Sequence, residues 1–312
     1  MELIRGLHNL RPRHRGCVVT VGAFDGVHRG HQAVIEHLKE RSAALDLPSA
    51  VIVFEPLPRE YFAPLEAPPR LMSFREKFLA LRQIGVDRLL RVRFDERVRS
   101  MSAKAFVEDV FVAGLGARHV VLGDDFRFGN EREGDLAFTR QLGEVHGFEA
   151  MPTPTFELDG ERVSSTRIRQ ALGASEFTQA AAMLGRPYSI AGKVIYGRQL
   201  GREMGVPTAN VALNRLRSPL SGVFAVEVDG AGLEAVPGIA NVGTRPTVDD
   251  SIQAILEVHL IDKAVDLYGK HIGVRFLHKV RDEKKFESLD ALKAAISSDV
   301  DKTRDWFASR TH

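Results

Sequence analysis

The chain has 312 residues, of which 44% are hydrophobic and 27% charged, and its formal net charge is +2 at pH 7. These values exclude a disordered or fibrous chain and indicate a soluble globular protein of about two domains. So small an excess of charge argues against nucleic acid as the main partner, although local Arg and Lys clusters could bind a small polyanion such as ATP.

The cellular compartment can be inferred from the cysteine content and from the lack of long apolar stretches. Cys17 is the only cysteine, so a disulfide within the chain is excluded, as is usual for a reducing environment. The N-terminus has no apolar signal-peptide core, and no stretch approaches the roughly 20 apolar residues of a membrane helix. We therefore expect a cytoplasmic protein with no membrane partner; the sequence leaves self-association open.

The first half alternates short apolar runs with amphipathic helical patterns. Strands are expected at 17–21, 50–54, 88–92 and 120–122, and helices at 30–44, 74–84 and 103–113. This alternation predicts a Rossmann-like, doubly wound α/β domain with a parallel sheet. Active sites in such sheets lie beyond the carboxyl ends of the strands.

The second half contains short strands punctuated by Gly and Pro, with no helix between most of them. They are expected at 190–195, 223–228, 236–242, 254–261 and 272–280, followed by a closing helix over 288–307. This pattern predicts a mainly antiparallel β-barrel or sandwich. A helix over 176–184 precedes a boundary near Gly185, which divides the chain into domains 1–185 and 186–312.

The segment GAFDGVHRGH, residues 22–31, follows a buried strand and opens a helix. Gly22 and Gly26 allow close approach of the backbone to a ligand. The helix N-terminus favours a phosphate, which His28 and His31 could hold while stabilising charge on the attacked phosphorus. Alternatively the two histidines could be metal ligands or simple capping residues, although no nearby cysteine or carboxylate completes a zinc site.

Two further polar segments lie where this site would need them. GDDFRFG, residues 123–129, follows the strand at 120–122, although Asp and Gly are also common in surface turns. In SSTRIR, residues 164–169, Ser164 or Ser165 could cap a helix whose first turn presents hydroxyls and Arg167 to a polyphosphate. A simple N-cap with solvated arginines is the alternative.

The second half carries a different polar set. The loop over 192–210 is rich in glycine but lacks the Lys-Ser/Thr end of a Walker A motif. Thr208 and Asn210 offer the oxygen ligands that Mg²⁺ takes beside ATP phosphates. Glu257 lies within a strand and is a candidate general base. The pattern alone favours a solvated position for it, because Leu256 and Val258 would point the other way.

Taken together, GAFDGVHRGH, GDDFRFG and SSTRIR resemble the FMN adenylyltransferase module of bacterial FAD synthetases, of the H-x-G-H nucleotidyltransferase superfamily. FEPLPREYF (54–62) and PPRLMSFREK (68–77) are also similar to it. Relatives often have His at the position of Leu57, and Asn or Val at that of Ala23. The resemblance implies an ATP site with these residues: Gly22, Phe24, Asp25, Gly26, His28, His31, Ser164, Ser165, Thr166 and Arg167. It also implies a flavin and nucleotide loop with Asp125, Phe126 and Arg127.

In the second half, GREMGVPTAN, ANVGTRPT, LEVHLID, DLYGK and RDEKKFESLDALK resemble the riboflavin kinase domain of the same bifunctional enzymes. With the first half, the similarity spans nearly the whole chain. It implies that Thr208 and Asn210 ligate Mg²⁺ and ATP, with Gly201 and Arg202 also at the nucleotide, and that Glu257 deprotonates the ribityl 5′-hydroxyl. Tyr196 stands where many relatives have His and is assigned no role.

The resemblance implies two ATP-dependent steps: riboflavin is phosphorylated to FMN, and FMN is adenylated to FAD with release of pyrophosphate. His28, His31 and Arg167 would stabilise the adenylyl transfer. Three alternatives were weighed: another phosphorylated acceptor such as phosphopantetheine or nicotinamide mononucleotide, a flavin or nucleotide sensor without catalysis, and an RNA-binding protein suggested by the pI of 8.7. The kinase-like half argues against another acceptor, because its product would be the substrate of the first half. The retained polar residues argue against a sensor, and the lack of an RRM signature argues against an RNA-binding protein.

Overall fold

The computed structural model describes residues 1–123, 126–153, 155–197, 206–246 and 252–310. The chain forms two compact units. The α/β unit comprises Met1–Pro68 and Phe74–Val163, and the barrel unit comprises Pro69–Ser73 and Ser164–His312. A short segment of the N-terminal half, Pro69–Ser73, therefore belongs to the barrel unit.

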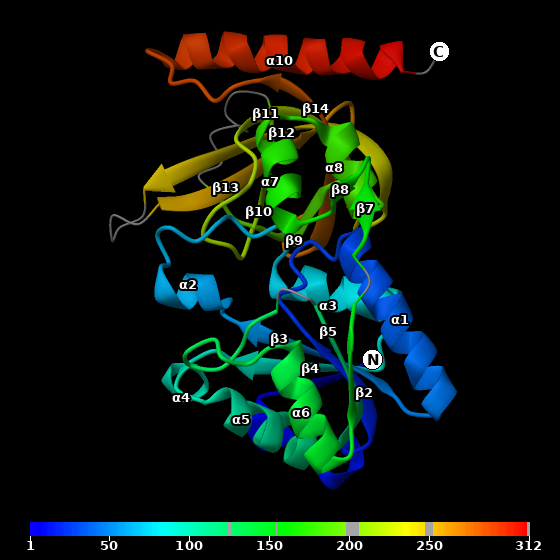
Figure 1. The fold of residues 1–312 in the computed structure, drawn as a ribbon. Coiled ribbons are helices and arrows are strands. Elements are labelled where there is room, and N and C mark those ends of the chain that lie inside the picture. The colour runs from blue at the N-terminus through cyan, green and yellow to red at the C-terminus, as the bar shows by residue number, and fades with distance from the viewer. Residues whose placement is uncertain (124–125, 154, 198–205, 247–251, 311–312) are drawn as a thin grey trace. The chain divides into compact units, whose positions relative to one another are not determined.

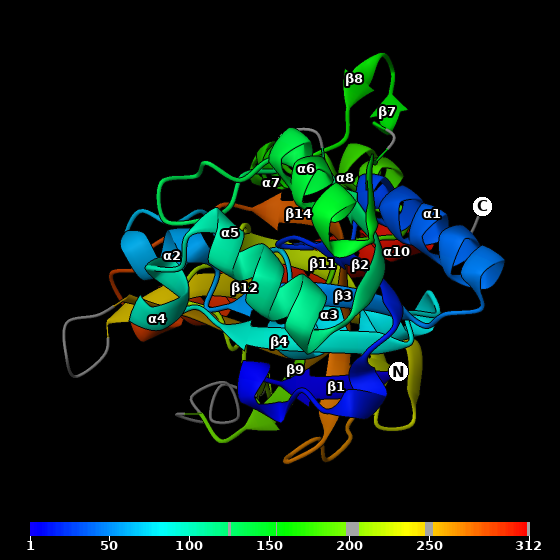
Figure 2. The ribbon, with the colours of Figure 1, turned by 60° about the horizontal axis from the view of Figure 1, so that its bottom comes forward.

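The α/β unit is built on a six-stranded sheet in the order β1-β4-β3-β2-β5-β6, in which every pair is parallel. Figure 2 labels β1 to β4 of this sheet. All five residues of β2 are buried, as expected for a strand covered on both faces. The strands are β1 Glu2–Arg5, β2 Cys17–Val21, β3 Ser49–Glu55, β4 Arg88–Arg93, β5 Ala117–Leu122 and β6 Glu149–Pro152.

Helices of this unit connect the parallel strands. They are α1 Arg29–Leu45, α2 Pro58–Phe62, α3 Phe74–Gln83, α4 Glu96–Arg99, α5 Ala103–Phe106, the π-helix η3 Val107–Gly114 and α6 Leu136–His146, with 3-10 turns η1 Leu7–Asn9 and η2 Pro12–His14. The helix expected at 103–113 thus continues from α5 into wider π turns, which place Val107, Val110 and Phe111 in the core. A small hairpin, β7 Glu157–Leu158 and β8 Glu161–Arg162, follows β6.

The barrel unit contains a closed antiparallel barrel in the order β10-β13-β12-β11-β14-β9. Its strands are β9 Ser189–Ile195, β10 Ala209–Val211, β11 Gly222–Gly230, β12 Leu233–Pro246, β13 Ile252–Leu260 and β14 His271–Arg281. Alternate residues fill the interior, so Leu256 and Val258 on β13 are each 1% exposed. The predicted fold class, an α/β nucleotidyltransferase-like domain followed by an antiparallel barrel, is confirmed.

The helices in the described part of the barrel unit are α7 Ser165–Gly173, α8 Phe177–Leu184 and α10 Leu289–Ser309. Ser288 caps α10, and the helix lies across β11, β12 and β14 (Figure 1). Val300 of α10 packs with Val223 and Ile239 of the barrel. The closing helix expected at 288–307 is therefore confirmed, and it covers part of the outer barrel surface.

The segment Pro69–Ser73 is tied to the barrel unit by buried side chains. Tyr188 donates a hydrogen bond from its hydroxyl to the Leu71 carbonyl at 3.2 Å, and Arg215 Nη1 donates to the same carbonyl at 3.1 Å. Arg169 Nε donates to the Pro69 carbonyl at 2.6 Å. Because Leu71 is fully buried, these bonds satisfy backbone groups that water does not reach.

Candidate active sites

The loop after β2 lies at the carboxyl edge of the parallel sheet, where the order of strands reverses. β2 pairs with β3 on one side and β5 on the other, and the later strands continue outward as β3-β4 on one side and β5-β6 on the other. Ligands of doubly wound sheets bind at such a point. Phe24 and Val27 adopt positive φ of 47° and 40°, which is uncommon for residues with these side chains. This backbone geometry is a feature of functional loops, so it supports the predicted site.

Buried side chains and hydrogen bonds hold this loop in place. Phe24, Asp25 and Val27 are at most 3% exposed. Gln32 Nε2 donates to the Val27 carbonyl at 2.9 Å, and the Gly22 N–H donates to the Ile52 carbonyl of β3 at 3.1 Å. The predicted residues Gly22, Phe24, Asp25 and Gly26 therefore form one rigid turn between β2 and α1.

His28 and His31 lie side by side at the N-terminus of α1. His28 is the N-cap, and its Nδ1 accepts the backbone N–H of His31 at 3.3 Å. The two imidazole rings stack with centroids 3.6 Å apart and planes inclined by 19°. A Cβ added to Gly30 would lie 3.2 Å from Cε1 and Nδ1 of His28. A glycine at this position therefore makes room for the His28 ring.

The electrostatic environment keeps His31 neutral. Burial lowers its pKa well below 6.5, and the neighbouring charges of His28, Lys77 and Arg162 lower it further. His31 Nδ1 is buried and has no hydrogen-bond partner among the described residues. A neutral imidazole keeps one N–H donor and one acceptor, so it can still donate to a phosphate oxygen.

Two buried charges near this edge were not singled out from the sequence. Lys77 on α3 is 0% exposed and Glu55 at the end of β3 is 5% exposed, and Lys77 Nζ lies 3.3 Å from Glu55 Oε1. A buried ion pair is costly unless its geometry and hydrogen bonds compensate for the loss of water. The only signal in the sequence was their place in two family-like strings, 54–62 and 68–77.

The loop after β5 is described in part. Phe126 stacks on Phe128 with centroids 5.7 Å apart and packs against the core, whereas Arg127 is exposed and lies 3.9 Å from Asp135. Asp125 lies outside the described residues. Since β5 is a direct neighbour of β2, this loop leaves the same sheet edge as the histidine loop.

Ser164 caps α7 in the barrel unit, as predicted. Its hydroxyl accepts the backbone N–H of Arg167 at 3.3 Å. Ser165 and Arg167 are half-buried and Thr166 is exposed, while Ile168 anchors the helix in the core. The first turn of α7 therefore presents two hydroxyls and a guanidinium around a capped N-terminus, a combination suited to phosphate oxygens.

The predicted kinase residues form a group on the outer face of the barrel. Asn210 on β10 is directly opposite Glu257 on β13, and both are half-buried. Thr208, also half-buried, immediately precedes β10. A Cβ on Gly197 would lie 2.2 Å from Asn210 Nδ2, so the glycine leaves space for that amide. Gly201 and Arg202 lie outside the described residues.

Glu257 takes the orientation expected from strand alternation. Its neighbours Leu256 and Val258 point into the barrel, and Glu257 points outward. It is half-buried rather than freely solvated, in line with the register that sets it beside Asn210. The pairing of β10 with β13 brings the Glu257 carboxylate next to Asn210. No local sequence pattern reveals this pairing.

In the described part of the chain, no cluster of three or more His, Cys, Asp or Glu side chains is arranged to hold a metal ion. Among the same residues, no helix is both long and apolar enough to cross a bilayer.

Comparison with known proteins identifies both halves. The FAD synthetase family matches residues 10–167 and the riboflavin kinase family matches residues 184–307. The bifunctional riboflavin kinase/FMN adenylyltransferase of Pseudomonas fluorescens is 52% identical over 100% of both chains. The protein of the same description from Escherichia coli K12 is 49% identical over 98% of both chains.

Among solved structures, a crystal structure described as a macrolide-efflux protein from Streptococcus pneumoniae has a TM-score of 0.78 and 30% identity. The match covers 98% of this chain and 100% of that one. The fold of each unit, the two family matches in the predicted order and relatives of about equal length agree. The chain belongs to the family of bifunctional riboflavin kinases/FMN adenylyltransferases.

Proposed function

We propose that this chain makes both flavin cofactors in succession, phosphorylating riboflavin to FMN and then adenylating FMN to FAD, each time with ATP. The observation that carries the proposal is the match of two independent family regions, in this order, to relatives similar over their full length. The product of the riboflavin kinase region is the substrate of the FAD synthetase region. We place the boundary between the two catalytic modules near Gly185.

For the kinase step we assign the general base to Glu257. Its carboxylate would accept the proton of the ribityl 5′-hydroxyl as that oxygen attacks the γ-phosphorus of ATP, and ADP would leave. A positioned base of this kind contributes about 10²- to 10⁴-fold to a rate. Its support is the outward, half-buried orientation of Glu257 directly opposite Asn210.

We assign the binding of Mg·ATP in the kinase to Thr208 and Asn210, with Gly201 and Arg202 at the nucleotide. A hydroxyl and an amide oxygen suit Mg²⁺, which usually completes its octahedron with phosphate oxygens and water. The bound ion would neutralise charge on the phosphates. The open space at Gly197 lets the Asn210 amide lie against the backbone beside Glu257, which supports this assignment.

For the adenylyl transfer we assign charge stabilisation to His28, His31 and Arg167. The FMN phosphate would attack the α-phosphorus of ATP in line and expel pyrophosphate. This nucleophile is already an anion near neutral pH, since its second pKa is about 6, so no general base is required. Positioning and charge stabilisation remain for the protein, as in other phosphoryl transfers. The neutral, stacked histidines at a helix N-terminus support this role.

The remaining ligand contacts are assigned from the sequence motifs. We assign ATP binding in the adenylyltransferase to the turn from Gly22 to Gly26 and the first turn of α7, and flavin or nucleotide binding to the loop of Asp125, Phe126 and Arg127. The proposed partners are small molecules only, in the cytoplasm, where riboflavin and ATP are available. Burial raises the pKa of the Cys17 thiol to about 12, so we assign Cys17 no chemistry.

Incubation with riboflavin, ATP and Mg²⁺, followed by chromatography of the flavins, tests the proposal. FMN should appear first and FAD after it, and ATP should yield both ADP and pyrophosphate. Incubation with phosphopantetheine or nicotinamide mononucleotide in place of riboflavin should yield no adenylated product. Absence of phosphorylated flavin with correctly folded protein would refute the proposed function.

A further inference from the structure

Three polar residues form one row across the outer face of the barrel. Asn210 on β10 is opposite Glu257 on β13, and Glu257 is opposite Asn241 on β12. Directly opposed residues of antiparallel strands have Cβ atoms about 4.5–5.5 Å apart. Glu257 therefore has a carboxamide residue on each side, and only Asn210 has a role in the proposed mechanism.

Burial shows that Asn241 belongs to the same face as Glu257. Its chain neighbours Ala240 and Val242 are 0% and 1% exposed and fill the barrel interior. Asn241 itself is half-buried, as are Glu257 and Asn210. Among the described residues, none forms a hydrogen bond with the Asn241 side chain. Its donor and acceptor are therefore available to a ligand on this face.

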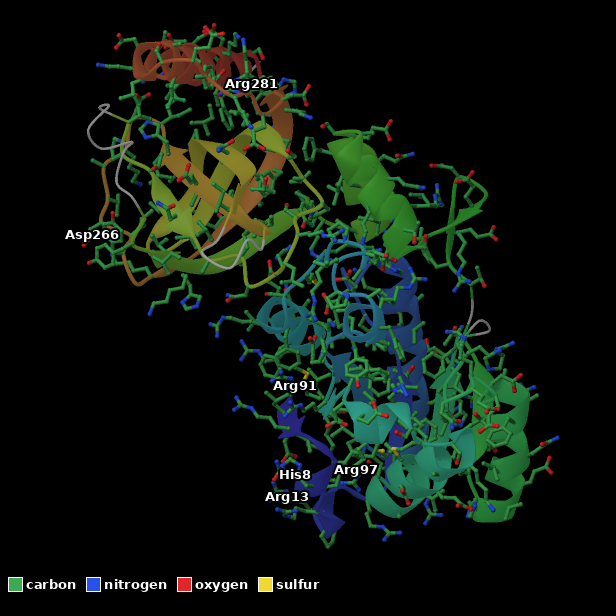
Figure 3. The ribbon with its side chains drawn as sticks, turned by 90° about the vertical axis from the view of Figure 1, so that its left-hand side faces the viewer. His8, Arg13, Arg91, Arg97, Asp266 and Arg281 are labelled. Carbon is green, nitrogen blue, oxygen red and sulfur yellow. The ribbon has the colours of Figure 1, made fainter. Side chains whose placement is uncertain are left out.

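Beyond Asn241 the row continues under α10. Asn241 is opposite Val223 of β11, and Val223 packs with Ile239 against Val300 of α10. Val223 is in turn opposite Arg281 of β14, which is labelled in Figure 3. Arg281 Nε lies 2.8 Å from Asp299 Oδ2 on α10. Asn241 thus lies between Glu257 and the apolar residues that α10 buries.

We propose that Asn241 is a substrate-binding residue of the kinase, whose carboxamide holds the ribityl hydroxyls and so positions the 5′-hydroxyl beside Glu257. This inference rests on the proposed function. With Mg·ATP assigned to the Asn210 side of Glu257, the acceptor must approach from the Asn241 side. There a flavin meets an amide for its polyol chain. A carboxamide both donates and accepts, as vicinal hydroxyls require.

The proposal is tested by comparing two proteins with riboflavin and with each of three analogues that lack one ribityl hydroxyl. Wild-type protein and Asn241→Ala are compared with riboflavin and with its 2′-, 3′- and 4′-deoxy analogues. Asn241→Ala should lower kcat/KM for riboflavin roughly 10- to 100-fold, the effect of losing hydrogen bonds in a half-buried site. In wild-type protein, at least one deoxy analogue should have a lower kcat/KM than riboflavin. This difference between the two substrates should largely disappear in the variant. KM for ATP in the kinase step and the rate of FMN adenylation should not change.

Asn241→Asp provides a second, independent readout. A carboxylate accepts hydrogen bonds but cannot donate one, so this change removes the donor that the carboxamide would give to a ribityl hydroxyl, and the KM for riboflavin should rise while the KM for ATP in the same step does not. Asn214→Asp, which makes the same change at an exposed residue of the same unit, is the matched control and should leave both KM values in place.

Two results would overturn the proposal. In the first, Asn241→Ala loses as much kcat/KM for each deoxy analogue, relative to riboflavin, as the wild-type protein does. In the second, Asn241→Asp and Asn214→Asp have the same KM for riboflavin. The second comparison decides if the alanine variant does not fold. Glu257→Gln, measured in parallel, reports on the proposed function separately. If that variant keeps full kinase activity, the proposed base is wrong, whatever the outcome at Asn241.

Discussion

His28 and His31 are joined twice: the imidazole of His28 accepts the backbone N–H of His31, and the two rings stack 3.6 Å apart. The same residue therefore caps α1 and supports the ring that follows it one turn later. Because the cap fixes the orientation of His28, a change at either position is expected to disturb the other.

Acid should destabilise the protein through His31. Burial and neighbouring charges lower the pKa of this group below 6.5 in the folded state. Between that lowered pKa and about 6.5 the unfolded chain binds more protons, so the free energy of unfolding falls as pH drops through this window. Above about 6.5 no such loss occurs. Urea unfolding measured at about pH 5.5 and 7.5 gives the free energy of unfolding at each pH. That free energy should fall less between about pH 7.5 and 5.5 in His31→Gln than in wild type. An equal fall in both proteins would rule out His31 as the cause.

Gly30→Ala should separate stability from adenylation. Alanine favours a helix over glycine by about 1 kcal/mol, so the melting temperature should be unchanged or higher. The new Cβ would crowd the His28 ring at 3.2 Å and force it to shift by a few tenths of an ångström. FMN adenylation should therefore fall while riboflavin phosphorylation is unaffected. A variant with both activities at wild-type rates would show that the position of His28 is not critical.

Glu257→Gln keeps the shape of the side chain and removes its basicity. Riboflavin phosphorylation should fall by about 10²- to 10⁴-fold, whereas adenylation of added FMN should continue. Glu234→Gln, at an exposed position of the neighbouring strand β12, is the matched control and should leave both rates unchanged. Kinase activity at the wild-type level in Glu257→Gln would rule out this residue as the base.

Asn210→Ala should raise the Mg²⁺ concentration needed for half-maximal riboflavin phosphorylation and the KM for ATP in that step. Mg²⁺ demands near-ideal octahedral geometry, so loss of one oxygen ligand weakens the bound complex. The Mg²⁺ dependence of FMN adenylation, measured on the same preparation, provides an internal control. Identical Mg²⁺ titrations of phosphorylation in variant and wild type would argue against the assigned ligand.

Strands that are buried on both faces could be predicted closely, and others could not. The run CVVTV at 17–21 coincides with β2 because every residue in it is buried. The edge strand β1, Glu2–Arg5, was not predicted, since its sequence ELIR buries only Ile4. β10, three residues long, lacks an apolar run altogether. Short and edge strands depend on pairing with distant segments, and local periodicity does not report it.

Long-range contacts also explain why the structural units differ from a simple division of the sequence. Pro69–Ser73 is assigned to the barrel unit because Tyr188 and Arg215 bond its carbonyls from more than 100 positions away. No spacing within the segment signals that association. The boundary near Gly185 between catalytic modules stays a prediction, which separate assays of the two activities can address.

The candidate sites were predictable where a motif is local. GAFDGVHRGH placed both histidines at the start of α1, and of the two serines that could cap the next motif's helix, Ser164 is the cap. Asn241 lies in the string ANVGTRPT but received no role from the sequence, because no local pattern relates it to Glu257. Only the register of β12 against β13 sets it opposite Glu257. The assignments of Asp125, Gly201 and Arg202 stay predictions and lie outside the described residues.

The most direct test of two sequential sites is the fate of riboflavin in the double variant His28→Ala, His31→Ala, followed by chromatography of the flavins. The account predicts that FMN accumulates at the wild-type rate while FAD is not formed, because the change removes charge stabilisation only in the adenylyl transfer. Loss of FMN and FAD together, in a variant that melts at the wild-type temperature, would contradict the assignment of the two steps to separate modules.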